Sequence, residues 1–232
     1  MKILIISDIH GNITALDAIN EKADLVLCLG DVVNYGPYPK ECIERVKNLT
    51  DKIVRGNHDN AVGKGMDCRC SAKYKEISDA GKVFTNNVLN TSEKNFLSNL
   101  PVTLKVEIKG EIFLLSHASP GGDMYKYIRP ETTDKDLKLE INDIGADIVF
   151  IGHTHLPMIR EVDGIKIVNP GSVGQPRDGI PMVSYAIWED GKVEIKRVAY
   201  NIDAAVKGLQ ETSIPSNHVK KLSKILMEGG MY

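Results

Sequence analysis

The first 60 residues alternate short apolar runs with helical segments, and this alternation constrains the fold more than any other feature. Residues 2–6, 25–29 and 52–54 are apolar and predict strands, whereas residues 13–20 and 40–47 between them predict helices. This strand–helix order is typical of a buried parallel sheet. Ligand sites in such sheets lie beyond the carboxyl ends of the strands, so we expect the functional site there.

Antiparallel strand pairs are predicted in the second half of the chain, each joined by a turn that contains glycine. The pairs are residues 102–108 with 111–116, 158–162 with 166–168, and 183–188 with 193–199. Residues 147–151 predict one more buried strand, residues 133–144 predict a helix, and the segment from Ile202 onward is also expected to be helical. Together these elements predict an α/β fold of two stacked mixed β-sheets flanked by helices, a four-layer α/β/β/α sandwich.

The length of the chain, 232 residues, suits one large domain. We therefore expect a single domain over residues 1–232, with a helical segment at about 60–101 that lies beside the site like a cap. The net charge of -2 gives no basic excess, so no nucleic-acid-binding patch is predicted. No apolar run is long enough for a signal peptide or a membrane span, which favours a cytoplasmic protein. The sequence leaves a homo-oligomer open.

Four cysteines occur in the chain, at positions 28, 42, 68 and 70. Cys28 lies in an apolar run and is expected to be a buried thiol. Cys68 and Cys70 flank Arg69 in a polar stretch, where a metal or redox role is one interpretation. Because a second pair of cysteines is missing, a zinc site is weakly supported, and we favour thiols of a surface loop.

Five of the six histidines directly follow a predicted strand, which is hard to explain by packing. They are His10, His58, His117, His153 and His155, and they are accompanied by Asp8, Asp31, Asn57 and Asp59. Burying so many polar groups without partners would be costly, and metal coordination would satisfy them together. Imidazole, carboxylate and amide ligands without thiolate suit Mn, Fe, Co, Ni or Zn. Six or seven ligands exceed what one catalytic metal uses, so two metal ions are expected.

Several motifs together resemble the signature of the calcineurin-like metallophosphoesterase superfamily. They are Asp8-Ile-His10, Gly30-Asp31, Gly56-Asn-His-Asp59, His117 and Gly152-His-Thr-His155, in an order and spacing that match the family. Asn169-Pro-Gly-Ser172 and Gly174-Gln-Pro-Arg177 resemble its small prokaryotic phosphodiesterase branch. One departure is Ala118 after His117, where relatives commonly have glycine; the ligand itself is intact.

The resemblance implies a site with two divalent transition-metal ions. It places Asp8, His10 and His155 on the first ion, Asn57, His117 and His153 on the second, and Asp31 as the bridge between them. Such a pair keeps a net positive charge that attracts phosphate, and it activates a bridging hydroxide that attacks phosphorus. The family pattern makes His58 the general acid, or a donor to the phosphoryl group. Asp59 is then expected to orient the His58 ring and to favour the imidazolium.

Two further residues are candidates for substrate binding. Asn12 could touch phosphate, although capping a helix would explain it equally well. Arg177 could bind phosphate with two hydrogen bonds, and a structural salt bridge explains it equally well. Tyr35 and Tyr38 are expected to serve turns and packing rather than to line a base pocket.

The predicted activity is hydrolysis of phosphodiester bonds in small substrates. Alternatives on the same site are a phosphomonoesterase, a dinucleoside polyphosphate hydrolase and a protein phosphatase, because pocket width and distal contacts decide between them. A non-catalytic scaffold is a different class of function. The presence of His58, His117, His153 and His155 argues against it, since a scaffold has no reason to hold all of them.

Overall fold

The computed structural model describes residues 1–230 of the chain. Its strands are β1 (Lys2–Ile6), β2 (Leu25–Cys28), β3 (Thr103–Ile108), β4 (Glu111–Ser116), β5 (Ile148–Phe150), β6 (Met158–Val162), β7 (Ile165–Asn169), β8 (Val183–Glu189) and β9 (Lys192–Val198). Its helices are α1 (Ile13–Leu16), α2 (Pro39–Leu49), α3 (Asn57–Gly63), α4 (Ala72–Val88), α5 (Thr91–Asn99), α6 (Asp134–Ile141), α7 (Ile202–Gln210) and α8 (Ser216–Glu228).

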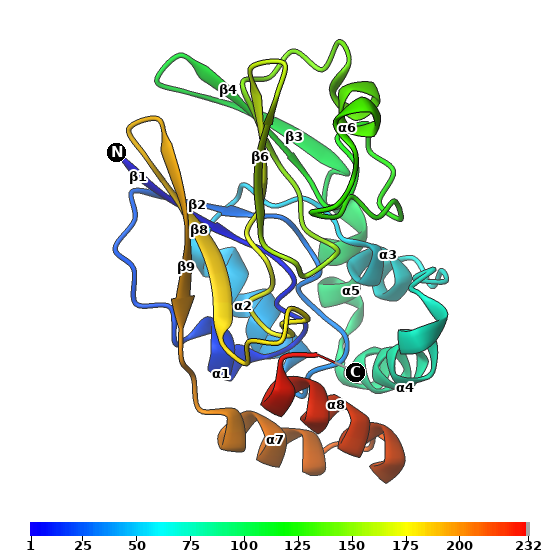
Figure 1. Ribbon diagram of the computed structural model, residues 1–232. Helices are drawn as coiled ribbons and strands as arrows, with labels where there is room; N and C mark the ends of the chain where they lie inside the picture. The colour runs from blue at the N-terminus through cyan, green and yellow to red at the C-terminus, as the bar shows by residue number, and fades with distance from the viewer. Residues whose placement is uncertain (231–232) are drawn as a thin grey trace.

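Two mixed sheets stack face to face, which confirms the predicted fold class (Figure 1). One sheet has the strand order β2-β1-β8-β9, and the other has the order β3-β4-β5-β7-β6. The first strand of the chain pairs in parallel with β2 and antiparallel with β8. Strands from both ends of the chain therefore share one sheet. The three predicted antiparallel pairs are all present, as β3–β4, β6–β7 and β8–β9.

Two predicted elements of the first 60 residues are wrong in extent. Residues 52–54 do not form a third full strand, because only Ile53 makes a bridge, to Cys28. The chain leaves the sheet at once: the backbone N–H of Arg55 donates to Pro101 at 2.7 Å, and α3 begins at Asn57. The helix expected at 13–20 ends after one turn, at Leu16.

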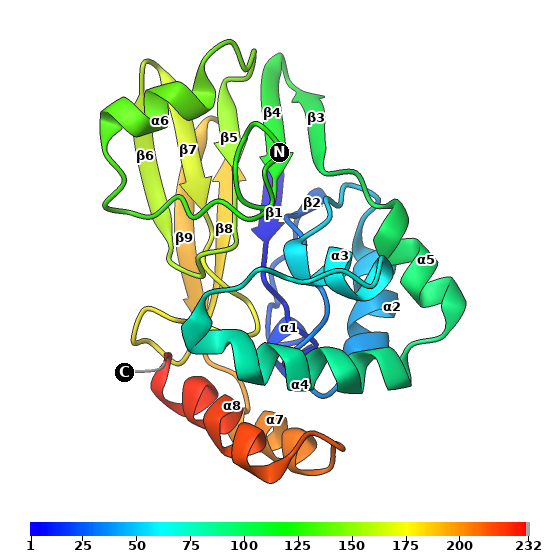
Figure 2. The ribbon, with the colours of Figure 1, turned by 90° about the vertical axis from the view of Figure 1, so that its right-hand side faces the viewer.

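The space between the sheets is filled by aliphatic and aromatic side chains. Ile3 and Ile5 of β1 and Trp188 of β8 pack there against Phe113 and Phe150 of the other sheet. A second apolar cluster packs α1 and α2 against the outer face of the first sheet, and a third packs α6 against the outer face of the second. Helices α7 and α8 lie together at one end of the molecule beside α4 (Figure 2). No helix in residues 1–230 combines the length and apolar character that crossing a bilayer requires.

Trp188 should be a major source of stability because it joins the two sheets. Its indole is 1% exposed and meets the Phe113 ring edge-on at 5.3 Å. Trp188→Ala should lower the free energy of unfolding by about 3–5 kcal/mol, measured by urea denaturation. Leu139→Ala on α6, where the side chain is 71% exposed, is the control and should change it by less than about 0.5 kcal/mol. Equal effects of the two substitutions would contradict this view of the core.

Candidate metal centre

The chain turns that follow β1, β2, β4 and β5 bring polar side chains together at one edge of the sandwich. Asp8 and His10 follow β1, Asp31 follows β2, His117 follows β4, and His153 and His155 follow β5, while Asn57 starts α3. All seven side chains are buried, none more than 4% exposed. The seven residues predicted as metal ligands are therefore neighbours in space.

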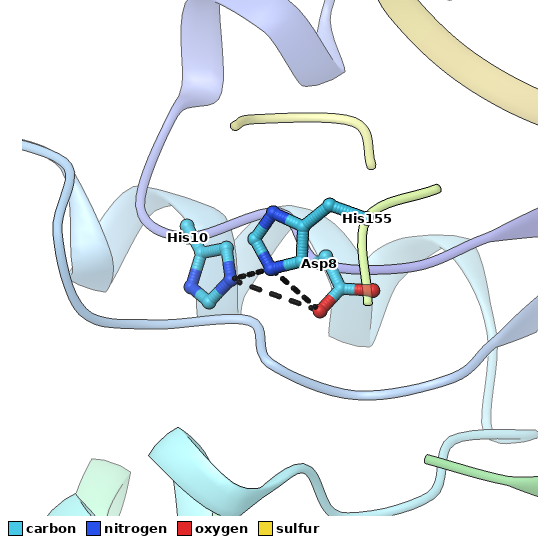
Figure 3. A group of neighbouring side chains, drawn as sticks. All are labelled: Asp8, His10 and His155. Carbon is cyan, nitrogen blue, oxygen red and sulfur yellow. Dashed lines mark hydrogen bonds and ion pairs between the residues drawn. The ribbon is translucent and has the colours of Figure 1, made fainter. Parts of the chain in front are cut away.

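Asp8, His10 and His155 form one group with metal-ligand geometry (Figure 3). The Nε2 atoms of the two histidines lie 3.1 Å apart. Asp8 Oδ1 lies 3.3 Å from Nε2 of His155 and 3.7 Å from Nε2 of His10. One oxygen and two ring nitrogens thus face a common point.

Asp31, His117 and His153 form the second group, and Asn57 joins it. Oδ1 of Asn57 lies 3.0 Å from Nε2 of His117 and 3.0 Å from Nδ1 of His153. Asp31 Oδ2 lies 3.3 Å from Nε2 of His117 and 3.7 Å from Nε2 of His10. The carboxylate of Asp31 therefore stands between the two groups.

Backbone contacts turn the lone pairs of these ligands inward. The Nδ1 atoms of His10, His117 and His155 face the carbonyl oxygens of Val33, Leu29 and Gln175 at 3.2, 2.8 and 2.5 Å. If each Nδ1–H donates to its carbonyl, each Nε2 is left as an acceptor aimed at the other ligands.

The two carboxylates are oriented in a similar way. Asp8 Oδ2 accepts hydrogen bonds from Ser7 Oγ at 2.6 Å and from the backbone N–H of His153 at 3.0 Å. Asp31 Oδ1 accepts from the backbone N–H of His58 at 2.8 Å. In each case the other oxygen faces the imidazoles.

Two buried atoms of this site lack any hydrogen-bond partner among residues 1–230: Asp8 Oδ1 and His153 Nε2. Together with acceptor nitrogens that face one another, an orphaned carboxylate oxygen is costly in a buried site. Divalent cations would satisfy these atoms, so the residues present fit two metal ions, one at each group.

The backbone is strained at the same positions. Asp8, His10, Asp31, His153 and His155 have φ of 54°, 50°, 53°, 67° and 61°, in the left-handed region that residues other than glycine rarely adopt. Such strain persists only where the surrounding structure enforces it, and it concentrates at functional sites. Here it points five ligands inward from the ends of strands.

Burial and charge set the protonation of these groups. Burial acts to raise the pKa of Asp31, but the facing His117 and His58 imidazoles outweigh it and hold that pKa well below its ordinary value. Burial lowers the pKa of His153 to about 3 and keeps the ring neutral, as a ligand must be. For His117 burial acts in the same direction, but the Asp31 carboxylate prevails and raises the pKa to about 9. A proton on His117 therefore competes with a cation for this ring.

His58 lies beside the second group, but its ring is held by Asn34 rather than by Asp59. Asn34 Nδ2 lies 2.7 Å from Nδ1 of His58, and Asn34 Oδ1 accepts the backbone N–H of Tyr35 at 2.7 Å. The amide nitrogen of Asn34 must therefore be the atom that faces His58, and Nδ1 accepts. The remaining ring proton then sits on Nε2, 3.9 Å from Asp31 Oδ2. Burial lowers the pKa of His58 to about 4.

The prediction that Asp59 orients His58 and favours the imidazolium is wrong. The Asp59 carboxylate accepts backbone N–H groups of Asp31 at 2.8 Å, Val32 at 2.9 Å and Gly56 at 3.0 Å. It therefore ties the turn after β2 to the start of α3. Burial and the nearby Asp31 carboxylate raise the pKa of Asp59 to about 7. Sequence reasoning missed Asn34, whose signal was its position three residues after Asp31.

The structure shows the hydrogen-bond partners of Asn12 and Arg177, the two candidates for substrate binding. Asn12 caps α1 by accepting from Ala15 N at 3.1 Å and also donates to Gly174 O at 3.0 Å, so the capping interpretation is confirmed. Arg177 forms no ion pair with any residue in the described range 1–230, which excludes the salt-bridge interpretation there. It donates to Gln175 Oε1 at 2.6 Å and stacks on Tyr74 at 3.9 Å.

The expectation of surface-loop thiols is wrong for Cys68, which is buried, whereas Cys70 is partly exposed on the loop between α3 and α4. Cys68 is 2% exposed, and its sulfur lies 3.2 Å from Ser78 Oγ. Its carbonyl accepts from Asn57 Nδ2 at 2.8 Å, which turns Asn57 Oδ1 toward the histidines. The segment of Cys68 thus supports a ligand from behind.

These features define the class of protein: an α/β sandwich with two adjoining His/Asp groups that could bind metal ions at the ends of its strands. Comparison with known proteins agrees. Residues 1–191 match the model of the calcineurin-like phosphoesterase superfamily domain. The chain belongs to this superfamily, which confirms the resemblance seen in the sequence.

Three relatives illustrate the range of similarity. The protein MJ0912 of Methanocaldococcus jannaschii is 34% identical, over 92% of this chain and 93% of the relative. Phosphodiesterase YfcE of Escherichia coli K12 is 26% identical over 84% of this chain and 91% of the relative. The crystal structure of a metallophosphoesterase from Sphaerobacter thermophilus is 32% identical, with a TM-score of 0.82 over 96% of this chain and 98% of that structure.

Gly56 should be essential for the position of Asp31. A Cβ at Gly56 would lie 2.0 Å from Asp31 Oδ1 and 2.4 Å from Asp31 N, far inside contact distance. Gly56→Ala should therefore displace the carboxylate between the two groups and reduce the number of bound metal ions, measured by elemental analysis after dialysis. Gly121→Ala, whose Cβ would come no closer than 3.7 Å to another atom, is the matched control. Full metal content in Gly56→Ala would show that this contact does not position the centre.

Proposed function

We propose that this protein is a metal-dependent phosphodiesterase that hydrolyses small phosphoester substrates at a centre of two divalent metal ions. The observation that carries the proposal is the position of Asp31, whose Oδ2 faces His117 of one ligand group and His10 of the other at 3.3 and 3.7 Å. A carboxylate between two ligand groups is the arrangement that a pair of adjacent cations requires. The similarity to a named phosphodiesterase supports the reaction class.

Two ions at this centre would supply an activated water and would neutralise charge on the phosphoryl group. Asp8, His10 and His155 would hold the first ion, and Asn57, His117 and His153 the second, with Asp31 shared. Nitrogen and oxygen donors without thiolate suit Mn, Fe, Co, Ni or Zn. The experiment for the whole proposal is turnover of bis(p-nitrophenyl) phosphate by protein loaded with each metal in turn. Bound metal without turnover on any phosphate ester would favour a scaffold instead.

His58 would donate a hydrogen bond to the phosphoryl group or to the leaving oxygen. Because Nδ1 accepts from Asn34, the ring proton lies on Nε2, the atom that faces the Asp31 carboxylate. A neutral ring with a fixed tautomer can donate a hydrogen bond from Nε2–H to the phosphoryl oxygen or to the leaving oxygen as the ester bond breaks. Asn34 would act as a positioning residue, and Ser78 supports it, since the Asn34 amide lies 3.2 Å from Ser78 Oγ.

Phosphomonoesterase and protein phosphatase activities would use the same centre. A panel of substrates distinguishes them from phosphodiesterase activity. The assay compares mono-, di- and cyclic phosphate esters under one metal condition. Preference for monoesters would replace the diester assignment but leave the metal centre intact.

Asp31→Asn should abolish the pairing of the two ions. Metal ions stabilise the transition state by several kcal/mol. Since ~1.4 kcal/mol corresponds to a factor of ten in rate, kcat/KM should fall by about three orders of magnitude. Elemental analysis should show fewer metal ions per chain than in the wild type. A variant with normal metal content and normal turnover would remove Asp31 from the proposed role.

His58→Ala should keep both ions yet slow turnover by about 10²–10³-fold, the usual cost of removing one hydrogen-bond donor to charge that develops in the transition state. Asn34→Gly deletes the positioning side chain without strain, because glycine accepts the φ of 77° at this position. It should lower kcat by about fivefold, since one hydrogen bond is worth roughly 1 kcal/mol.

The double variant tests whether Asn34 acts through His58 or whether each residue has a separate structural role. Adding Asn34→Gly to His58→Ala should cause little further loss if Asn34 acts through His58. Loss of a metal ion in His58→Ala alone would show that His58 is a metal ligand rather than a hydrogen-bond donor to the substrate.

A further inference from the structure

The seven arginines of the chain fall into groups with different partners. Three form ion pairs with carboxylates: Arg45 with Asp17, Arg160 with Asp134, and Arg197 with Asp178. Arg55 is 8% exposed and donates to the Ser98 carbonyl. Arg69, Arg129 and Arg177 have no ion pair anywhere in residues 1–230; we call these three residues the arginine rim.

Each arginine of the rim stacks on a tyrosine. The guanidinium carbons of Arg177, Arg69 and Arg129 lie 3.9, 4.7 and 5.2 Å from the ring centroids of Tyr74, Tyr125 and Tyr127. Stacking holds the guanidinium plane and keeps its charge, while N–H groups at its edge stay available for an anion. The neighbouring Lys126 differs, because its ammonium is paired with Glu140.

Contacts connect the rim to both ligand groups of the metal centre. The Tyr127 ring lies 4.2 Å from the His153 ring, and Tyr127 OH accepts the Ser71 backbone N–H at 3.3 Å. Tyr125 OH accepts from Asn60 Nδ2 on α3 at 3.2 Å.

Arg177 reaches the first ligand group through Gln175. The Gln175 side chain accepts from Arg177, and its backbone carbonyl faces Nδ1 of His155 at 2.5 Å. Three separate chain segments therefore bring unpaired cations to the surroundings of one centre.

We propose that the arginine rim is an anion-binding subsite, and that the substrate carries a second phosphate group besides the one that reacts at the metal centre. This inference rests on the proposed function and specifies its substrate class. The chain has a net charge of -2, so three unpaired guanidinium groups around one site do not reflect a generally basic surface. Metal ions at the centre would neutralise the reacting phosphoryl group, whereas a distal phosphate would bind the rim through charge-assisted hydrogen bonds.

The test compares thymidine nucleotides that differ only in the number and position of their phosphate groups. Thymidine 5′-monophosphate, thymidine 5′-diphosphate and thymidine 3′,5′-bisphosphate are assayed as competitive inhibitors of chromogenic diester hydrolysis by the metal-loaded enzyme, with metal in excess. At least one doubly phosphorylated nucleotide should inhibit about tenfold more tightly than the monophosphate. Each added hydrogen bond to a charged group makes a substantial contribution to the binding free energy. The difference should shrink as ionic strength rises.

Three glutamine variants assign the difference to the rim. Arg69→Gln, Arg129→Gln and Arg177→Gln remove one charge each and should each reduce the preference for the second phosphate by threefold or more. Arg45→Gln is the matched control, since Arg45 is paired with Asp17 on the outer helices, and it should keep the full preference. A preference within threefold of unity in the wild type, or one that survives all three rim substitutions, overturns the inference.

Calorimetry on metal-free protein in chelator, with the same three nucleotides, separates this inference from the proposed function. Tighter binding of a doubly phosphorylated nucleotide that depends on the rim, without turnover of any ester under any metal, would sink the phosphodiesterase proposal and keep the subsite. Turnover of the chromogenic diester with equal affinity for all three nucleotides would support the phosphodiesterase proposal and overturn the subsite.

Discussion

The structure depends on a set of buried lone pairs that face one another. His10, His117 and His155 each turn Nδ1 toward a backbone carbonyl, so that Nε2 points at carboxylate oxygens of Asp8 and Asp31. Such an arrangement is electrostatically unfavourable for a protein alone, and it becomes favourable when cations occupy the space between the ligands. The sandwich beneath must therefore be rigid enough to hold repelling groups at fixed positions.

Rigidity comes from how the chain ends its strands. The ligands follow β1, β2, β4 and β5, whose apolar residues are locked into the core between and beside the sheets. Left-handed backbone conformations at the ligands are enforced by this core and by side chains that accept several backbone N–H groups. Asp59 illustrates the second device, since its one carboxylate joins the turn after β2 to the start of α3. Asp59, which the sequence suggested as a catalytic residue, thus stabilises the backbone of Asp31, the residue that lies between the two ligand groups.

Around this centre lie further residues that hold its side chains in position or surround them. Asn34 fixes the tautomer of His58, and Cys68 holds Asn57 through its carbonyl. Tyrosines that stack with unpaired arginines come from α4 and from the loop between β4 and α6, and Tyr127 of this loop packs on a ligand histidine. The same fold supports many functions, and the difference between them lies in such surroundings. In the proposed function the metal centre would supply the chemistry at phosphorus, and the surrounding loops would determine the choice of substrate.

The sequence by itself determined the fold class, the family and the seven candidate ligands. Alternation of apolar runs reports strands, and polar residues directly after strands must gather at one edge of a sheet, because parallel strands end together. Only the tertiary structure decided which partner each polar side chain has. Asp59 adjoins His58 in the sequence, but the helical turn directs its carboxylate to the backbone and leaves Asn34 to hold the ring. Sequence patterns report the direction of the chain at each residue, whereas hydrogen-bond partners depend on distances between segments far apart along it.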